Sequence, residues 1–242
     1  NNIAQQHTRS AVMASICHAL TDVVGVRGGN VRIYDAKHGG NLQRSTPFEG
    51  LPKGVRIENA WGGTSVEAPV PGPWKNGAGS AGCVGALARG EADILINIAL
   101  CKGHSAQFGS FTMCCKNHFG SFTPGPGHAG DGTDYLLCLN KSQAILGAQD
   151  RRGRVQFPRQ QLCVIDALWA SKPGPGGHPT HQPNALFMGV MAPVVDYQLA
   201  TNFRRDAMHW PINENVAQRF LSEFGFRPDQ LPAGGKIIDV AR

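Results

Sequence analysis

Hydrophobic residues follow two different periods along this chain, and the two periods alternate from one end to the other. Apolar positions three and four residues apart are typical of amphipathic helices, whereas short alternating or continuous apolar runs are typical of strands. The first period predicts helices over residues 8–24, 135–145, 193–204 and 213–224, a helix from residue 80 to 88, and a short helix or turn over 111–118. The second predicts strands over residues 31–35, 55–59, 92–100, 161–168, 185–190 and 236–240.

Strands separated by helices favour a mostly parallel sheet with helices on both of its faces. The length of 242 residues suits one domain, and the sequence contains no internal repeat. The chain has 31 glycines and 16 prolines, and two segments, residues 123–133 and 172–183, are especially rich in both. We therefore expect a single α/β domain over residues 1–242, built on a mostly parallel sheet with long Gly/Pro-rich loops.

The net charge is +6, from 23 basic and 17 acidic residues, which is compatible with an anionic partner. The basic residues are scattered, and the densest group, residues 151–154, is better explained as a solvated hairpin tip than as a nucleic-acid contact. We therefore expect no nucleic-acid partner.

No apolar run is long enough to predict a transmembrane segment. The chain starts at Asn1 without an initiator methionine or a signal peptide, so we expect a processed product or a fragment.

Seven cysteines are present, an odd number, and none of them forms a Cys-x-x-Cys pair. This spacing predicts neither an iron–sulfur cluster motif nor a zinc ribbon, because both usually need closely spaced thiolates. Cys138 and Cys163 lie inside apolar runs, and we expect them to be buried thiols.

The segment from residue 93 to 122 carries the strongest indication of a functional site. A buried-strand pattern ends in Cys101-Lys102-Gly103-His104, and a loop of small residues leads to Cys114-Cys115-Lys116-Asn117-His118. In open α/β sheets, ligands bind beyond the carboxyl ends of strands. The sequence therefore predicts a ligand site just after residue 100.

The residue types suggest roles within this site. Lys102 and Lys116 are candidate anion ligands, with solvated surface lysines as the alternative. His104 can move a proton near neutral pH, and Asp166, at the end of another predicted strand, could orient His104, hold a metal or pair with a lysine. These four residues are the candidate catalytic set: Lys102, His104, Lys116 and Asp166.

Further polar residues are candidates for ligand or metal binding. Asn97 and Asn117 are candidate ligand-binding residues, and so is Asp196, for which helix capping is the favoured alternative. Cys101, His104 and His118 could bind a transition metal, although their spacing matches no structural zinc pattern. Apart from such a metal, the sequence identifies no cofactor.

The same residues occur in an order that resembles a known family. They are Asn97, Lys102 and His104, then Lys116, Asn117 and Gly120, then Asp166, the 174–177 loop and Pro193-Val194-Val195-Asp196. This order is similar to that of the domain of unknown function 362 family, whose members carry Asn-x-Pro-x-x-Lys-x-His, Lys-Asn-x-x-Gly and Asp-Pro-Val-x-x-Asp patterns. The resemblance extends from about residue 8 to the predicted C-terminal strand, and it is specific in the order of the patterns.

The chain also departs from the family pattern. Ala99 and Ala192 replace a proline and an aspartate, the N-terminal strand of the pattern is missing, and so is the cysteine-rich cluster segment of some members. The resemblance therefore implies mainly an α/β fold and a site. Many relatives carry twin-arginine export signals or accompany redox proteins, which implies a periplasmic or extracellular location and a redox association.

Two functions from different classes remain. The first is an enzyme or redox-associated protein that binds an anionic small molecule or a metal cofactor at the Lys/His/Asp site. The second is a non-catalytic extracellular structural or filament-forming protein on an inherited enzyme-like fold. In that case a sheet edge exposed by the missing strand would recruit further chains or form a homo-oligomer.

Overall fold

The fold is built on three small sheets. The computed structural model describes residues 8–35, 48–59, 65–72, 74, 79–123, 132–174 and 178–231. One sheet pairs β1 (Arg32–Asp35) with β2 (Arg56–Asn59), and a second pairs β3 (Ser65–Val70) with β4 (Gly79–Val84). The third has the order β6-β5-β7-β8 and consists of β5 (Leu95–Gly103), β6 (Phe111–Thr112), β7 (Gln160–Ser171) and β8 (Ala185–Gly189).

The helices vary greatly in length. The α-helices are α1 (Ser10–His18), α3 (Gly85–Ala88), α4 (Cys114–Asn117), α5 (Gly132–Lys141), α6 (Gln143–Leu146), α7 (Ala192–Gln198) and α8 (Glu214–Ser222). Two π-helical segments, Ala19–Val23 and Leu199–Ala207, extend α1 and α7, and short 3₁₀ turns cover Gly28–Asn30, Ala106–Phe108, His118–Gly120 and Pro228–Gln230. Over the described part of the chain, no helix has the length and apolar character needed to cross a membrane.

The predicted mostly parallel sheet is wrong. Helices and strands are indeed mixed, but β3–β4, β5–β6 and β7–β8 are antiparallel pairs, and only β1–β2 and β5–β7 are parallel. A parallel neighbour requires a long crossover, usually through a helix. The chain has such a crossover between β5 and β7, through α4, α5 and α6, whereas no α-helix separates β5 from β6, and none is described between β7 and β8.

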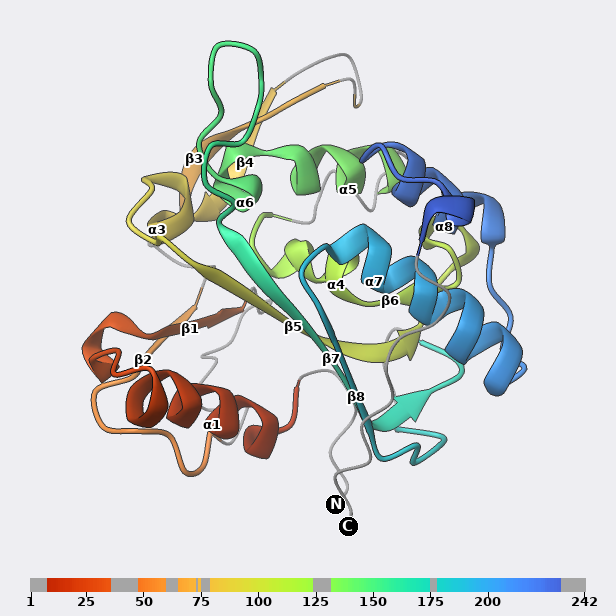
Figure 1. Cartoon of the computed structure of the whole chain (residues 1–242), viewed down its shortest axis with the longest axis horizontal. Coiled ribbons are helices and arrows are strands. Elements are labelled where there is room, and N and C mark those ends of the chain that lie inside the picture. Colours follow the sequence, from red (N-terminus) through yellow and green to blue (C-terminus); the bar gives the residue numbers. More distant parts are fainter. Residues whose placement is uncertain are drawn as a thin grey trace.

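The four-stranded sheet runs diagonally through the molecule and separates two unequal sides (Figure 1). Alternate residues of β5 face opposite sides, because successive side chains on a strand do so. Ala99 and Cys101 belong to the main core, with α4, α5, α7 and α8. The small unit of α1, β1 and β2 lies on the other side, around a second core of Cys17, Val31 and Ile33.

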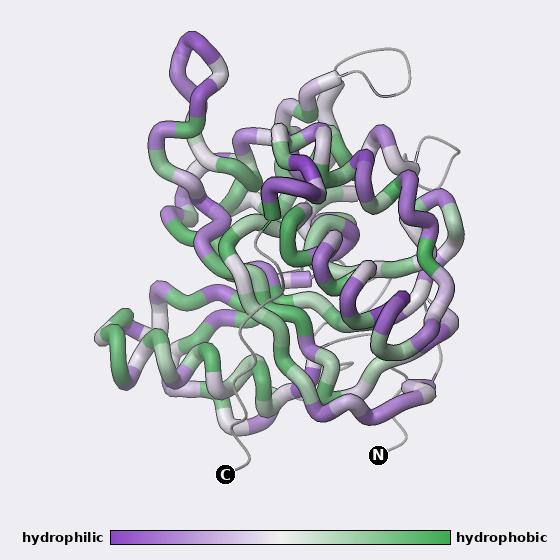
Figure 2. The backbone as a smooth tube through the Cα atoms, turned by 45° about the vertical axis from the view of Figure 1, so that its right-hand side comes forward, coloured by the Kyte–Doolittle hydropathy of each residue, from purple (hydrophilic) through white to green (hydrophobic). Residues whose placement is uncertain are grey.

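The hydropathy of the backbone follows this division. The strands through the middle of the molecule are mainly green in Figure 2, whereas the loop that projects between α6 and β7 is purple at its tip. That loop contains residues 151–154, which are exposed, as expected for a solvated tip.

Most predicted elements within the described residues occur close to their predicted bounds. The predicted short helix or turn over residues 111–118 begins with strand β6 and contains the short helix α4. The predicted helix over residues 80–88 is wrong for its first half, which is β4, and only Gly85–Ala88 is helical. The sequence did not predict β3, because Ser65–Val70 contains a proline and leads into a Pro-rich segment. The predicted strand over residues 236–240 and parts of both Gly/Pro-rich loops lie outside the described residues.

Candidate functional site

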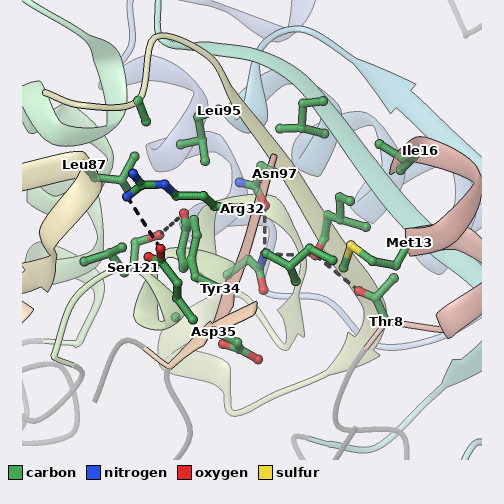
Figure 3. Close-up of a pocket in the computed structure, with 18 of the residues that line it drawn as sticks. Thr8, Met13, Ile16, Arg32, Tyr34, Asp35, Leu87, Leu95, Asn97 and Ser121 are labelled. Atoms are coloured by element: carbon green, nitrogen blue, oxygen red, sulfur yellow. Dashed lines mark hydrogen bonds and ion pairs between the residues drawn. The ribbon is translucent and has the colours of Figure 1, made fainter. Parts of the chain in front are cut away.

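A cavity of about 820 Å³ lies between β5 and the small N-terminal unit (Figure 3). β5, α4 and the turn after α4 form one wall, and α1 and β1 form the other. Six of the predicted site residues line the cavity: Asn97, Lys102, His104, Lys116, Asn117 and His118. The structure therefore brings together most of the cluster that the sequence singled out.

The cavity exists because one edge of β5 is largely open. β7 pairs along one side of β5, but on the other side β6 pairs only with Lys102 and Gly103. The carbonyl of Ile98 instead accepts hydrogen bonds from Asn117 Nδ2 at 3.0 Å and from Thr8 Oγ1 at 3.3 Å. Side chains thus take the place of a neighbouring strand and leave room for a ligand beside β5.

Lys102 and Lys116 reach the cavity from β5 and α4. Lys116 Nζ lies 3.7 Å from the ring centroid of Phe119 and 4.7 Å from that of Phe108. Within the described residues, neither ammonium group has a hydrogen bond or a direct ion pair. The two groups are therefore partly removed from water, and the nearest compensation is the carboxylate of Asp35, which also lines the cavity and acts on Lys102.

This environment changes the acidity of both lysines. Burial, together with the positive charge of Lys102, lowers the pKa of Lys116 to about 7. Burial also lowers the pKa of Lys102, against a smaller rise caused by Asp35. The faces of aromatic rings attract a cation, but here they do not compensate for the lost hydration. Near neutral pH, a substantial fraction of Lys116 is therefore an uncharged amine.

An amide network forms the floor of the cavity beside Lys116. Asn97 Nδ2 donates to the carbonyl of Cys114 and to Gln160 Oε1, each at 2.9 Å. Asn97 Oδ1 accepts a hydrogen bond from Asn117 Nδ2, also at 2.9 Å. Asn97 and Asn117 therefore hold α4 against β5, and they present part of a polar surface to the cavity.

His118 extends this network in its neutral form. Its Nε2 lies 2.9 Å from Gln160 Oε1, which can only accept, so Nε2 carries the proton. Nδ1 consequently accepts from the hydroxyl of Ser121 at 3.0 Å, and Ser121 Oγ accepts from the hydroxyl of Tyr34 at 2.9 Å. Burial lowers the pKa of His118 to about 4 and raises that of Tyr34. The hydrogen bond between Tyr34 and Ser121, at the end of this network, connects β1 to the main part of the protein (Figure 3).

His104 lies at the end of β5, on the cavity wall. Its Nδ1 accepts the backbone N–H of Ser105 at 2.8 Å, so the neutral ring carries its proton on Nε2. The ring packs edge-on against Phe108, with the centroids 4.7 Å apart. Phe108 thus contacts both His104 and Lys116.

Asp166, for which the sequence left three roles open, is buried and binds backbone N–H groups. Its Oδ2 accepts the backbone N–H of Arg9 at 3.0 Å, and its Oδ1 accepts that of Leu168, also at 3.0 Å. Arg9 is the residue that precedes α1, so Asp166 fixes the start of this helix against β7. The observed role of Asp166 is structural, and it lies outside the lining of the cavity.

Asp196 acts as a cap, but not on its own helix. It lies within α7, where Oδ1 accepts the backbone N–H of Cys114 at 2.9 Å and Oδ2 accepts that of Cys115 at 2.8 Å. These are the first two residues of α4. Burial raises the pKa of Asp196 to about 7, against the opposing effect of both hydrogen bonds.

The three candidate metal ligands have separate partners. Cys101 lies in the main core, where its sulfur is hydrogen-bonded to the buried guanidinium of Arg204, and burial raises the thiol pKa to about 11. His118 is held in the amide network, and His104 packs against Phe108. The described ranges contain no group of three or more His, Cys, Asp or Glu side chains placed to hold a metal ion.

Sequence reasoning missed several polar residues. Tyr34 and Ser121 line the cavity, and together with Gln160, which is outside its lining, they complete the hydrogen-bonded network. Arg204 also lies outside the lining and donates to the carbonyls of Ser171 and Lys172 where β7 ends. Of these residues, only Tyr34 could have been found from the sequence. The alternation of apolar and polar residues over 31–35 places Ile33 in the core and its neighbours on the opposite side of the strand. The others depend on contacts between distant segments.

The capping role of Asp196 can be tested by removing its carboxylate. We expect Asp196→Ala to lower the free energy of unfolding by about 2–4 kcal/mol, because two buried N–H groups lose their acceptor. Asp196→Asn should cost less, since its amide oxygen still accepts one of them. Urea denaturation provides the measurement. The exposed Asp206→Ala serves as a control that should leave stability nearly unchanged, and equal losses in Asp206→Ala and Asp196→Ala would contradict the capping role.

The state of His118 predicts a pH dependence of stability. The folded pKa of about 4 lies below the ordinary value of 6.5, so the folded state resists protonation. Stability is therefore present above pH 6.5 and is lost as the pH falls towards 4, by about 3 kcal/mol. Urea denaturation of the wild type and His118→Gln, each at pH 6.5 and at pH 4, isolates the contribution of His118 to stability. A stability difference between the two proteins that does not change with pH would contradict the prediction.

No protein-family model, curated protein or solved structure matches this chain. The resemblance to the domain of unknown function 362 family therefore stays a prediction from the order of sequence patterns. The geometry of the cavity is what supports a proposal about function.

Proposed function

We propose that the cavity binds a small organic anion, whose carboxylate or phosphate group lies between Lys102 and Lys116. The observation that carries this proposal is the pair of partly buried ammonium groups that face one cavity and form no direct ion pair with any described residue. Removing a charge from water is costly unless another charge compensates for it. A bound anion would supply that compensation for both lysines at once.

The remaining walls suit the rest of such a ligand. Asn117 and His104 add polar groups near the lysines, whereas Met13, Ile16 and Ile96 provide apolar surface elsewhere in the cavity. Ligand sites commonly combine an apolar lining with a few polar groups that fix the orientation. The cavity thus suits an anion with an organic body better than a bare inorganic ion.

Replacing the lysines tests this function. We expect Lys102→Met and Lys116→Met each to weaken anion binding at least about tenfold, because each removes a charge-assisted contact. Each should also raise the free energy of unfolding at pH 7, since a poorly hydrated charge disappears. Calorimetry with a panel of small carboxylates and phosphates, including lactate and inorganic phosphate, provides the affinities, and urea denaturation provides the stabilities.

The exposed Lys53→Met is the matched control, and it should change neither quantity. Binding that is unaffected by both cavity substitutions would contradict the proposal. So would the absence of binding by every anion of the panel.

A second candidate function is assembly of copies of this chain through β8. This strand is at the edge of the four-stranded sheet as described, and Leu186 and Met188 within it and Val190 directly after it are 43%, 61% and 64% exposed. An edge strand with exposed apolar side chains is a template for pairing with another chain. A second copy offers the same strand, so two β8 edges could pair around a two-fold axis.

Light scattering at rising protein concentration tests this assembly. We expect the wild type to form dimers or larger species, and we expect Met188→Lys to shift it towards the monomer because a charge disrupts edge pairing. The exposed Arg152→Lys is a neutral control on the distant loop. A wild type that stays monomeric at all concentrations would rule out this candidate.

A further inference from the structure

The environment of Lys116 suits a reactive amine as well as a binding group. Its Nζ lies over the rings of Phe119 and Phe108, it lines the cavity, and it has no hydrogen-bond acceptor within the described residues. An amine without an acceptor has its lone pair available to an electrophile whenever it is unprotonated. The lowered pKa described above adds to this availability.

Lys102 supplies a second feature of reactive amines, a neighbouring cation. Amine nucleophiles are typically lysines that are desolvated by apolar surroundings or placed next to another positive charge. Lys116 has both, because aromatic rings surround its head group and the charge of Lys102 acts on it. Lys102 itself remains the more strongly basic of the two and is therefore the better partner for an anionic group.

We propose that Lys116 forms a Schiff base with a small 2-oxo acid held in this cavity, with the carboxylate of that acid against Lys102. The proposal rests on the anion-binding function proposed above and names its substrate class. A 2-oxo acid carries its carboxylate and its electrophilic carbonyl on adjacent carbons. It can therefore engage both lysines from a single position.

The chemistry needs no component beyond the amine and the oxo acid. The lone pair of Lys116 Nζ attacks the carbonyl carbon, a C–N bond forms, and the carbonyl π electrons move to the oxygen. A proton passes from nitrogen to that oxygen, and the resulting carbinolamine loses water as its C–O bond breaks. The product is an imine between Lys116 and the former carbonyl carbon, and no atom is oxidised or reduced.

Reductive trapping tests the covalent step. The full chain is incubated with sodium pyruvate and sodium cyanoborohydride, which reduces an imine to a stable secondary amine, and peptide mass spectrometry then locates the adduct. We expect one dominant adduct at Lys116, with labelling reduced at least tenfold in Lys116→Met and unchanged in Lys53→Met. Labelling spread evenly over the exposed lysines, or retained at the same level in Lys116→Met, would overturn the proposal.

Lys102→Met tests the placement of the carboxylate. We expect it to lower the extent of pyruvate labelling at Lys116 more strongly than labelling by the uncharged aldehyde propanal, because propanal loses only the effect of the Lys102 charge on the pKa of Lys116. An equal loss with both carbonyl compounds would overturn the pairing of Lys102 with the carboxylate. Circular dichroism of each variant shows whether the fold is retained.

Lactate separates failure of this inference from failure of the proposed function. Lactate has the charge and nearly the size of pyruvate, but it has no carbonyl group. Lactate that binds through both lysines, together with pyruvate that is not trapped, would overturn the Schiff base and leave anion binding intact. Failure of every anion to bind would overturn both.

Discussion

Asp196 lies inside α7, yet its carboxylate accepts the first two backbone N–H groups of α4, a helix of only four residues. A helix this short has almost no stability of its own, because helix nucleation is unfavourable and its few internal hydrogen bonds do not offset that cost. The buried carboxylate therefore anchors the start of α4 to α7, while Asn97 and Asn117 hold α4 against β5. The positions of Lys116 and Asn117 in the cavity depend on these contacts between distant segments.

The open edge of β5 is the second constraint on the site. A strand without a neighbour exposes backbone groups that must be satisfied in another way. At Ile98, the side chains of Asn117 and Thr8 donate hydrogen bonds to the backbone carbonyl, and the space beside them remains open as the cavity. A full-length β6 would have closed it, so the short antiparallel pairing of β6 is directly responsible for the site.

Polar interactions between distant segments hold the two sides of the cavity together, among them an ion pair of Arg32 with Glu91 at 3.3 Å. The hydroxyl chain from Tyr34 through Ser121 to His118 connects β1 to the main part, and Asp166 connects the start of α1 to β7. The cavity therefore lies where two hydrophobic cores meet, which is a common position for a ligand site. The lysines at this junction stay poorly hydrated and unpaired, an arrangement that lowers stability but suits the binding of an anion or reaction with an electrophile.

The sequence by itself determined most of the helices and strands and the cluster around Lys102, His104 and Lys116, because local periodicity and spacing along one strand–loop–helix segment carry that information. It could not determine strand direction, since pairing depends on how the chain returns between strands. Nor could it show that Asp166 and Asp196 bind the backbone of other helices, or that Cys101 faces away from Lys102 into the core. Only the tertiary structure decided these points, because each results from contacts between segments that are far apart along the chain.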